Sequence, residues 1–215
     1  MKTSKKITFP KLENEFLENI LRQLISQHHI IQMFFTKDTS SLFSHLIIHI
    51  EKNSDAQELQ QSKWVKKVRN RYRIDVQFIY SVKFHYKFSF GHPFIECCCQ
   101  PSALIYQNEE SGDSTIIARG WKKYKKKFNV FQEGFYHDHD IHKSHVQNLI
   151  SEGSQNSVFT SYARLIEYDL AYLEDLYAGT TFNTLDLDER INNLMEYIPE
   201  IQKYFVKNSG RTYYL

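Results

Sequence analysis

The chain has 215 residues, enough for one large domain or two small ones, and its formal net charge of +2 is too small to indicate nucleic-acid binding by itself. Hydrophobic residues make up 41% of the chain and aromatic residues 15%, which can build compact cores, while 7 Gly and 4 Pro exclude a low-complexity or turn-rich all-β protein. No apolar run approaches the roughly 20 residues that span a bilayer, and the N-terminal segment lacks the apolar stretch of a signal peptide. We therefore expect a soluble cytoplasmic protein of two domains without a membrane partner.

The first half of the chain predicts a small sheet with flanking helices. A stripe of apolar residues predicts a helix over 10–27, a short strand follows over 30–35, and polar residues 37–41 form a turn. The stretch 42–50 contains Leu46-Ile47-Ile48 and no Gly or Pro, which is typical of a strand buried on both faces, so we place it in the middle of the sheet. Further along, the patterns predict a helix over 56–73, a strand over 75–82, a short amphipathic segment over 83–90, and a helix followed by a strand over 94–106.

The polar segment 107–114 is the clearest linker, and we place the domain boundary there, with one domain over 1–110 and a second over 115–215. The second domain is predicted to contain only helices. They cover 116–135, 136–151 (continuing the same helix or starting a new one), 157–177 with Gly179 as C-cap, a stretch starting at Asp186 or Asp188, and another from Pro199. The predicted fold class is α+β, a small mixed sheet with flanking helices followed by an all-α bundle.

The three cysteines are consecutive, from Cys97 to Cys99. Neighbouring cysteines cannot form a framework of disulfide bridges, and zinc ligands at suitable spacings are missing. We expect reduced thiols that act as small buried apolar residues, in preference to a redox or metal role.

Two basic segments are candidates for contact with nucleic acid, and the simpler interpretation of such a segment is a solvated helix face. The first lies at the end of the predicted helix over 56–73, and the second lies opposite an aromatic stripe that begins at Trp121. The candidate residues are Lys63, Lys66, Lys67, Arg69, Arg71 and Arg73 in the first segment, and Lys122, Lys123 and Lys126 in the second.

A histidine-rich run over 137–145 is a candidate metal site. On a helix, Asp138, His142 and His145 share a face, as do His139 and His142, and such spacings can bind Zn²⁺ or Ni²⁺. No motif fixes a fourth ligand, so a polar, solvent-facing surface that responds to pH remains the alternative.

Several segments resemble a known fusion of a minimal nucleotidyltransferase domain with a HEPN domain. In the first half the resemblance rests on residues 46–50, 75–79, 94–96 and 103–106; in the second half it rests on 164–167, 176–179 and 180–188. The resemblance covers most of the chain and implies a nucleotidyltransferase-like sheet, a HEPN-like bundle and a homodimer formed through the helical domain.

The chain departs from the catalytic pattern of active nucleotidyltransferases. Those enzymes have a Gly-Ser turn, two acids one residue apart on the central strand and a third acid on the neighbouring strand, which together hold two Mg²⁺ at the transferring phosphate. Here the turn over 35–41 has no Gly, the paired positions are Phe43 and His45, Asp75 alone matches the third acid, and Asp38 is out of place.

The ribonuclease motif of HEPN proteins, an Arg followed by four to six residues and a His, is also missing from the second half. Arg164, Arg190 and Arg211 have no His at that distance, and the chain reads Thr184-Leu185-Asp186 where many fusions have Thr-His-Asn. The only match pairs Arg22 with His28 or His29 in the first domain.

We therefore expect a non-catalytic member of this fusion that acts as a nucleotide-, RNA- or protein-binding regulatory module. One alternative is an enzyme with a diverged site, using Asp75 and His45 with Mg²⁺ or the histidine run with Zn²⁺. The other is an antitoxin-like protein-binding partner. The sequence leaves open whether Phe34, Phe35 and Phe43 fill the cleft of the first domain.

Overall fold

The computed structural model describes residues 9, 12–37, 42–109, 119–153, 155–182, 184, 186–207 and 213–214. The chain divides into two compact units. Residues 1–89 with 95–119 form one, which we call the sheet unit, and residues 90–94 with 120–215 form the other, the helical unit. The short segment 90–94 therefore groups with helices that follow it much later in the sequence.

The sheet unit is built on a mixed four-stranded sheet of order β3-β2-β1-β4. Its strands are β1 (Ile30–Lys37), β2 (Ser44–Ile50), β3 (Ile74–Tyr80) and β4 (Leu104–Gln107). β1 is antiparallel to both β2 and β4, whereas β2 and β3 are parallel. The α+β class is confirmed, and so is the interior position of the strand predicted over 42–50.

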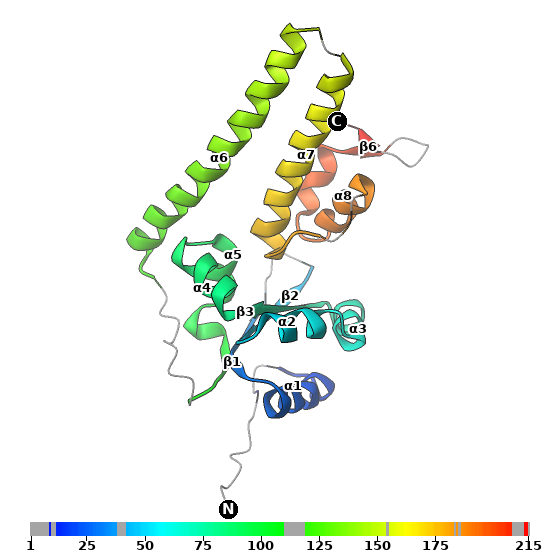
Figure 1. Cartoon of the computed structure of the whole chain (residues 1–215). Coiled ribbons are helices and arrows are strands. Elements are labelled where there is room, and N and C mark those ends of the chain that lie inside the picture. The colour runs from blue at the N-terminus through cyan, green and yellow to red at the C-terminus, as the bar shows by residue number, and fades with distance from the viewer. Residues whose placement is uncertain are drawn as a thin grey trace, which may run out of the picture. The chain divides into compact units, whose positions relative to one another are not determined.

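Three helices cover the apolar face of this sheet. Leu46, Ile48 and Ile50 alternate along β2 and pack into one core with residues of α1 (Glu15–Gln27), α2 (Asn53–Gln60) and α3 (Lys63–Tyr72). Alternation follows from the two-residue period of a strand, which sends every second side chain to the same face. α1 and α4 (Ser81–Ser89) lie on opposite sides of the sheet (Figure 1).

Two helix predictions in the sheet unit were wrong. The first helix starts at Glu15 instead of residue 10, because the Asn14 side chain caps it by accepting a hydrogen bond from the Leu17 backbone N–H at 3.1 Å. The single helix predicted over 56–73 is broken into α2 and α3. The break leaves Gln60 at the end of α2, where its side chain bonds the carbonyl of Val76 and the N–H of Phe78, both at 2.9 Å.

This side-chain contact matters because β3 is an edge strand, and an edge strand presents unpaired backbone groups that invite pairing with another chain. The Gln60 amide carries a donor and an acceptor, and it occupies one backbone carbonyl and one N–H of the edge as a neighbouring strand would. The helix break therefore protects part of the sheet edge.

The last part of the sheet unit agrees with the helix and following strand that were predicted over 94–106. α5 (Pro93–Cys98) precedes a 3-10 turn over Pro101–Ala103 and then β4. All three cysteines are free thiols; Cys98 and Cys99 are buried, and Cys97 is exposed. Burial raises the pKa of the Cys99 thiol well above its usual range, so this side chain stays protonated and apolar in character. The prediction of small buried residues is thus correct for two of the three.

The helical unit is dominated by a long helical hairpin (Figure 1). α6 (Trp121–Ser151) is one continuous helix, and after a turn at Gly153 the chain returns in α7 (Gln155–Ala178). α8 (Leu187–Met195) follows, with the Asp186 side chain accepting from the backbone N–H groups of Asp188 and Glu189. A 3-10 helix over Pro199–Lys203 comes next.

The expectation that this half contains only helices was wrong, because β5 (Val206–Lys207) pairs antiparallel with β6 (Tyr213–Tyr214). The apolar core of the unit lies where α7, α8 and the 3-10 helix meet, around Leu170, Ile191, Leu194 and Ile201. Among the described residues, no helix is long and apolar enough to cross a membrane.

Candidate functional site

The second face of the sheet carries an unusual number of buried polar side chains. Because Leu46, Ile48 and Ile50 face α1–α3, the alternate residues of the strands point to the opposite face. The buried polar side chains there belong to Gln32, His45, His49, Asp75 and Gln77. His45, Asp75 and Gln77 lie toward the start of the parallel pair β2–β3. His49 lies toward its other end, in register with Gln32 of β1.

At the start of the parallel pair, the structure brings together the two residues that the sequence singled out as catalytic candidates. His45 and Asp75 are register partners on neighbouring strands, and His45 Nδ1 lies 3.9 Å from Asp75 Oδ2. Asp75 Oδ2 also accepts a hydrogen bond from Gln77 Nε2 at 3.1 Å. The side chain of His45 is 4% exposed and that of Asp75 is 13% exposed, so one carboxylate sits in a nearly closed polar group.

The other position of the expected acid pair, Phe43, is apolar and equally enclosed. Phe43 is 1% exposed, and the guanidinium groups of Arg69 and Arg73 lie over its ring, at 4.8 Å and 5.7 Å from the centroid. Phe34 and Phe35 are also buried, Phe34 stacking on Phe84 of α4 at 6.3 Å. All three aromatic side chains therefore belong to the interior of the unit. Asp38 and residues 39–41 lie outside the described residues.

At the other end of the parallel pair, His49 forms a pair with Ser81 that the sequence reasoning missed. His49 Nε2 lies 2.9 Å from Ser81 Oγ at the start of α4, and the imidazole stacks on Phe84 at 4.2 Å. Burial, with a smaller contribution from His85, lowers the pKa of His49 to about 3. The imidazole is therefore neutral near pH 7 and too weak a base to activate the serine efficiently. The only signal in the sequence was a histidine inside an apolar strand.

Four of the six basic candidates in α3 and its C-cap Arg73 contact aromatic rings of the same unit. Besides the two arginines over Phe43, Lys67 Nζ lies 4.4 Å from the centroid of Phe16 and the Arg71 guanidinium lies 5.4 Å from Tyr72. Lys63 and Lys66 are exposed. Cation–π contacts of this kind stabilise the fold locally, so four of the six cations have a structural role on their own unit.

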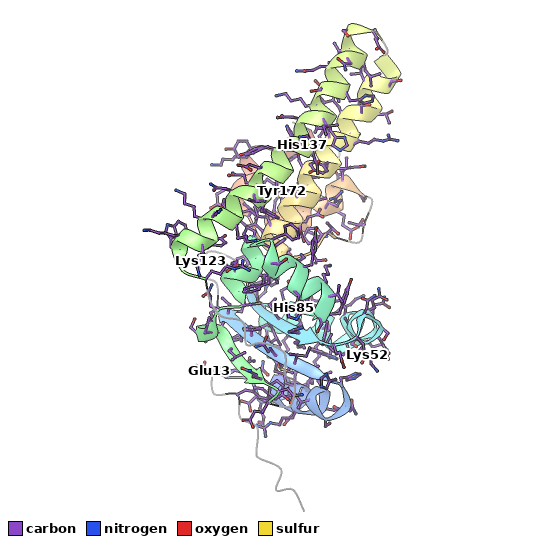
Figure 2. The ribbon with its side chains drawn as sticks, turned by 60° about the vertical axis from the view of Figure 1, so that its left-hand side comes forward. Glu13, Lys52, His85, Lys123, His137 and Tyr172 are labelled. Atoms are coloured by element: carbon purple, nitrogen blue, oxygen red, sulfur yellow. The ribbon has the colours of Figure 1, made fainter. Side chains whose placement is uncertain are left out.

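The lysines of α6 have a different setting. Lys122, Lys123 and Lys126 are all exposed, and the first turn of the helix contains no acidic residue. Lys123 lies near the start of α6, far from the turn into α7, while Tyr172 lies along the hairpin (Figure 2). These three lysines share a helix whose N-terminal dipole also favours anions.

The histidine run lies along the hairpin of α6 and α7, and three of its members contact α7. His139 Nδ1 lies 2.9 Å from Asp169 Oδ1, the hydroxyl of Tyr168 donates to Asp138 Oδ2 at 3.4 Å, and the ring of His142 lies 5.1 Å from that of Tyr168. Burial and the nearby Asp138 carboxylate raise the pKa of the Tyr168 hydroxyl. His145 is exposed.

The described part of the chain contains no group of three or more His, Cys, Asp or Glu side chains that could hold a metal ion. Asp138, His139, His142 and His145 accordingly do not come together as the helical spacing suggested. Helical spacing puts these side chains on the same side of α6, but the hydrogen-bond partners of His139 and Asp138 are side chains of α7.

The arginines considered for ribonuclease chemistry have other partners. Arg190 forms a buried ion pair with Glu174, its Nε lying 2.7 Å from Glu174 Oε1. Arg22 pairs with Glu18 at 3.0 Å on the same helix, and His28 Nδ1 lies 3.5 Å from Asp55. Arg211 lies outside the described residues.

Comparison of the chain with protein-family models, with curated proteins and with solved structures gives no match.

Proposed function

We propose that the protein is a non-catalytic relative of the nucleotidyltransferase–HEPN fusions that acts as an RNA-binding regulatory module. The observation that carries the proposal is the single carboxylate at the transferase position. Asp75 pairs with a histidine and a glutamine, while Phe43 is buried in the interior. Two Mg²⁺ ions need several carboxylate oxygens and an open approach for a triphosphate, and neither requirement is met by this group.

Binding of RNA is the remaining activity that the charge distribution favours. Phosphate contacts require cations that can reach solvent. Lys122, Lys123 and Lys126 of α6 are all exposed, whereas Lys67, Arg69 and Arg71 of α3 lie over aromatic rings and only Lys63 and Lys66 are exposed without such a contact. The absence of an acidic residue from the first turn of α6 leaves their charge uncompensated on the helix.

The test is calorimetric titration of the whole protein with a short RNA and with Mg²⁺-ATP at low salt. We expect RNA binding that weakens steeply as salt rises from about 50 to 200 mM, and no Mg²⁺-dependent binding of ATP. Replacing Lys122, Lys123 and Lys126 together by Ala should lower the affinity and reduce the salt slope by up to about 2, since each single-strand phosphate contact contributes roughly 0.7.

The matched control replaces Lys63, Lys66 and Lys67 by Ala, which removes the same charge from α3. We expect a smaller effect of this control on both affinity and salt slope. Binding of ATP that depends on Mg²⁺ and is lost in Asp75→Ala would overturn the proposal and favour transferase chemistry instead. Absence of RNA binding at low salt would overturn it in favour of a protein-binding role.

We further propose that the protein forms a homodimer through its helical unit, as the family resemblance implies. Exposed large apolar side chains on α6 and α7 are compatible with this arrangement; they include Tyr136, Ile141, Ile150, Phe159 and Tyr162. Light scattering of the purified protein tests the proposal, and a monomer at every concentration measured would contradict it.

A further inference from the structure

The first turn of α6 extends past the end of α7. Ring contacts pair Phe131 with Tyr172 at 5.7 Å and Phe135 with Tyr168 at 5.7 Å along the antiparallel hairpin. Continued at the same rise per residue, this pairing places the last residue of α7, Ala178, opposite about residues 125–130 of α6. Residues 121–124 therefore have no opposing turn of α7.

This projecting turn begins with an exposed aromatic ring at the end of a series of rings. Trp121 is 71% exposed, and its ring lies 5.8 Å from that of Tyr124. Tyr124 lies 6.0 Å from Phe128, which in turn lies 6.4 Å from Phe131. The series of rings therefore ends in an indole whose flat surface is largely open to solvent at the start of the helix.

Lysines border this aromatic stripe on both sides. At about 100° per residue, Lys125 lies roughly 40° from Trp121 on one side and Lys127 roughly 60° from Tyr124 on the other, with Lys122, Lys123 and Lys126 completing the circumference. All five lysines are exposed, and residues 119–132 contain no Asp or Glu. Lys127 lies close to Gly91, where an added Cβ would meet the Lys127 Cβ.

From this arrangement we propose that the start of α6 binds single-stranded nucleic acid, with an unpaired base stacked on Trp121 and the adjoining phosphates on the lysines. The inference rests on the RNA binding proposed above and specifies which form of RNA is bound and how. Bases of a duplex are already stacked on one another and cannot reach the indole, whereas an unpaired base can stack on an aromatic side chain.

An anionic membrane surface would also attract these lysines, but the apolar component is too small. Interfacial helices bury a broad apolar face, and here Trp121 is the one strongly exposed apolar side chain of the projecting turn, with lysines around the rest of the circumference. A single indole does not supply the buried area that membrane attachment requires.

Fluorescence of Trp121 tests the inference directly, because the chain has only 2 Trp and the other, Trp64, packs against Phe78. In a Trp64→Phe background of the full chain, the remaining signal reports Trp121 alone. The probes are a single-stranded RNA of about 10 nucleotides, the corresponding RNA duplex, and vesicles of phosphatidylserine and phosphatidylcholine.

We expect the single strand to quench Trp121 and to bind more tightly than the duplex, which should leave the fluorescence nearly unchanged. Trp121→Ala, made in the otherwise unaltered chain, should weaken single-strand binding by roughly 5- to 150-fold, and Trp121→Phe should recover most of that loss. The matched control is Tyr204→Ala, which removes an aromatic side chain that is 65% exposed after the 3-10 helix over Pro199–Lys203 and should leave binding unchanged.

The possible failures are distinguishable. If the single strand binds with a steep salt dependence but Trp121→Ala has no effect, or if the duplex binds equally well, the stacking inference is wrong and RNA binding by cations stands. If neither RNA binds at low salt, the proposed function itself fails. Quenching by vesicles without quenching by RNA would replace both with membrane binding.

Discussion

A buried ion pair joins the long hairpin to α8 and provides the sharpest test of how the helical unit is held together. Glu174 of α7 is 0% exposed, and its carboxylate accepts from Arg190 Nε at 2.7 Å, from Arg190 Nη2 at 3.0 Å and from the backbone N–H of Phe182 at 2.9 Å. Arg190 Nη2 also donates to the carbonyl of Glu167 at 3.3 Å. Every oxygen of this carboxylate therefore has a partner.

Glu174→Ala leaves the Arg190 guanidinium buried without its counter-ion. Removing one partner of a buried ion pair costs about 3–5 kcal/mol of the free energy of unfolding, because the remaining charge keeps its desolvation penalty and loses its compensation. For a chain of this size, that corresponds to a fall of about 6–20 °C in the midpoint of thermal unfolding. Replacing both residues by Leu should recover most of the loss, since a well-packed apolar pair is often as stable as the ion pair.

Urea unfolding followed by circular dichroism measures these differences, with the helical signal dominated by α6 and α7. The control is Glu133→Ala, which removes an exposed carboxylate from α6 and should change the free energy of unfolding by no more than about 0.5 kcal/mol. A Glu174→Ala variant as stable as the control would refute the reasoning. So would a double variant that is as unstable as the single one, because the loss could not then be assigned to the unpaired charge.

Three further changes test the close contacts and the buried histidine. Gly179→Ala should lower the thermal midpoint more than Gly153→Ala, since both have positive φ but, of the two, only a Cβ at 179 would meet a neighbouring side chain, the ring of Phe94. Gln60→Ala should reduce the free energy of unfolding by about 0.5–1.5 kcal/mol and increase self-association in light scattering, because two backbone groups of the sheet edge lose their partner. The pKa of His49 is about 3 in the folded chain and roughly 6.5 when unfolded, so the unfolded state binds the extra proton and stability falls as pH drops between these values. In His49→Phe, urea unfolding at about pH 4–6 should show a smaller dependence on pH.

Equal effects of the two glycine variants would show that the backbone conformation, and not the contact with Phe94, limits position 179. For the edge strand, Gln61→Ala is the matched control, because the neighbouring side chain is exposed at the end of the same helix. If the stability of His49→Phe depends on pH as strongly as that of the natural chain, other groups must titrate in this range and the assignment to His49 is wrong.

The fold could be predicted from the sequence where one local pattern determines the structure. The apolar run 46–48 predicted an interior strand because a strand buried on both faces needs continuous apolar residues. The break between α2 and α3 was not predicted, and the hydrogen bonds that Gln60 makes at this point join it to Val76 and Phe78, which lie 16 and 18 residues further along the chain and are not visible in a local pattern. The two-residue strands β5 and β6 are too short to produce a recognisable period.

In the candidate site, too, contacts that follow from local patterns could be predicted, and contacts between distant segments could not. His45 and Asp75 were paired as candidates by their places on two strands, and parallel register puts them side by side. The contact of His139 with Asp169 could not be predicted from the histidine run, because helical spacing describes one helix face and Asp169 lies 30 residues away on α7. The pair of His49 with Ser81 likewise depends on tertiary contact between β2 and the start of α4.

The different settings of the two basic segments bear on where a ligand would gain its binding energy. A cation already placed over a ring must give up part of that contact before it reaches a phosphate, as for Lys67 over Phe16. The lysines of α6 carry no such cost in their first turn, and they surround an indole whose exposed surface offers stacking in addition to charge. Because stacking on Trp121 adds free energy that salt does not screen, binding at α6 should retain more affinity at high salt than binding at α3. A salt titration of the two lysine triple variants compares these contributions, and if removing the α6 lysines left a steeper salt dependence than removing those of α3, the ligand would be held mainly by α3.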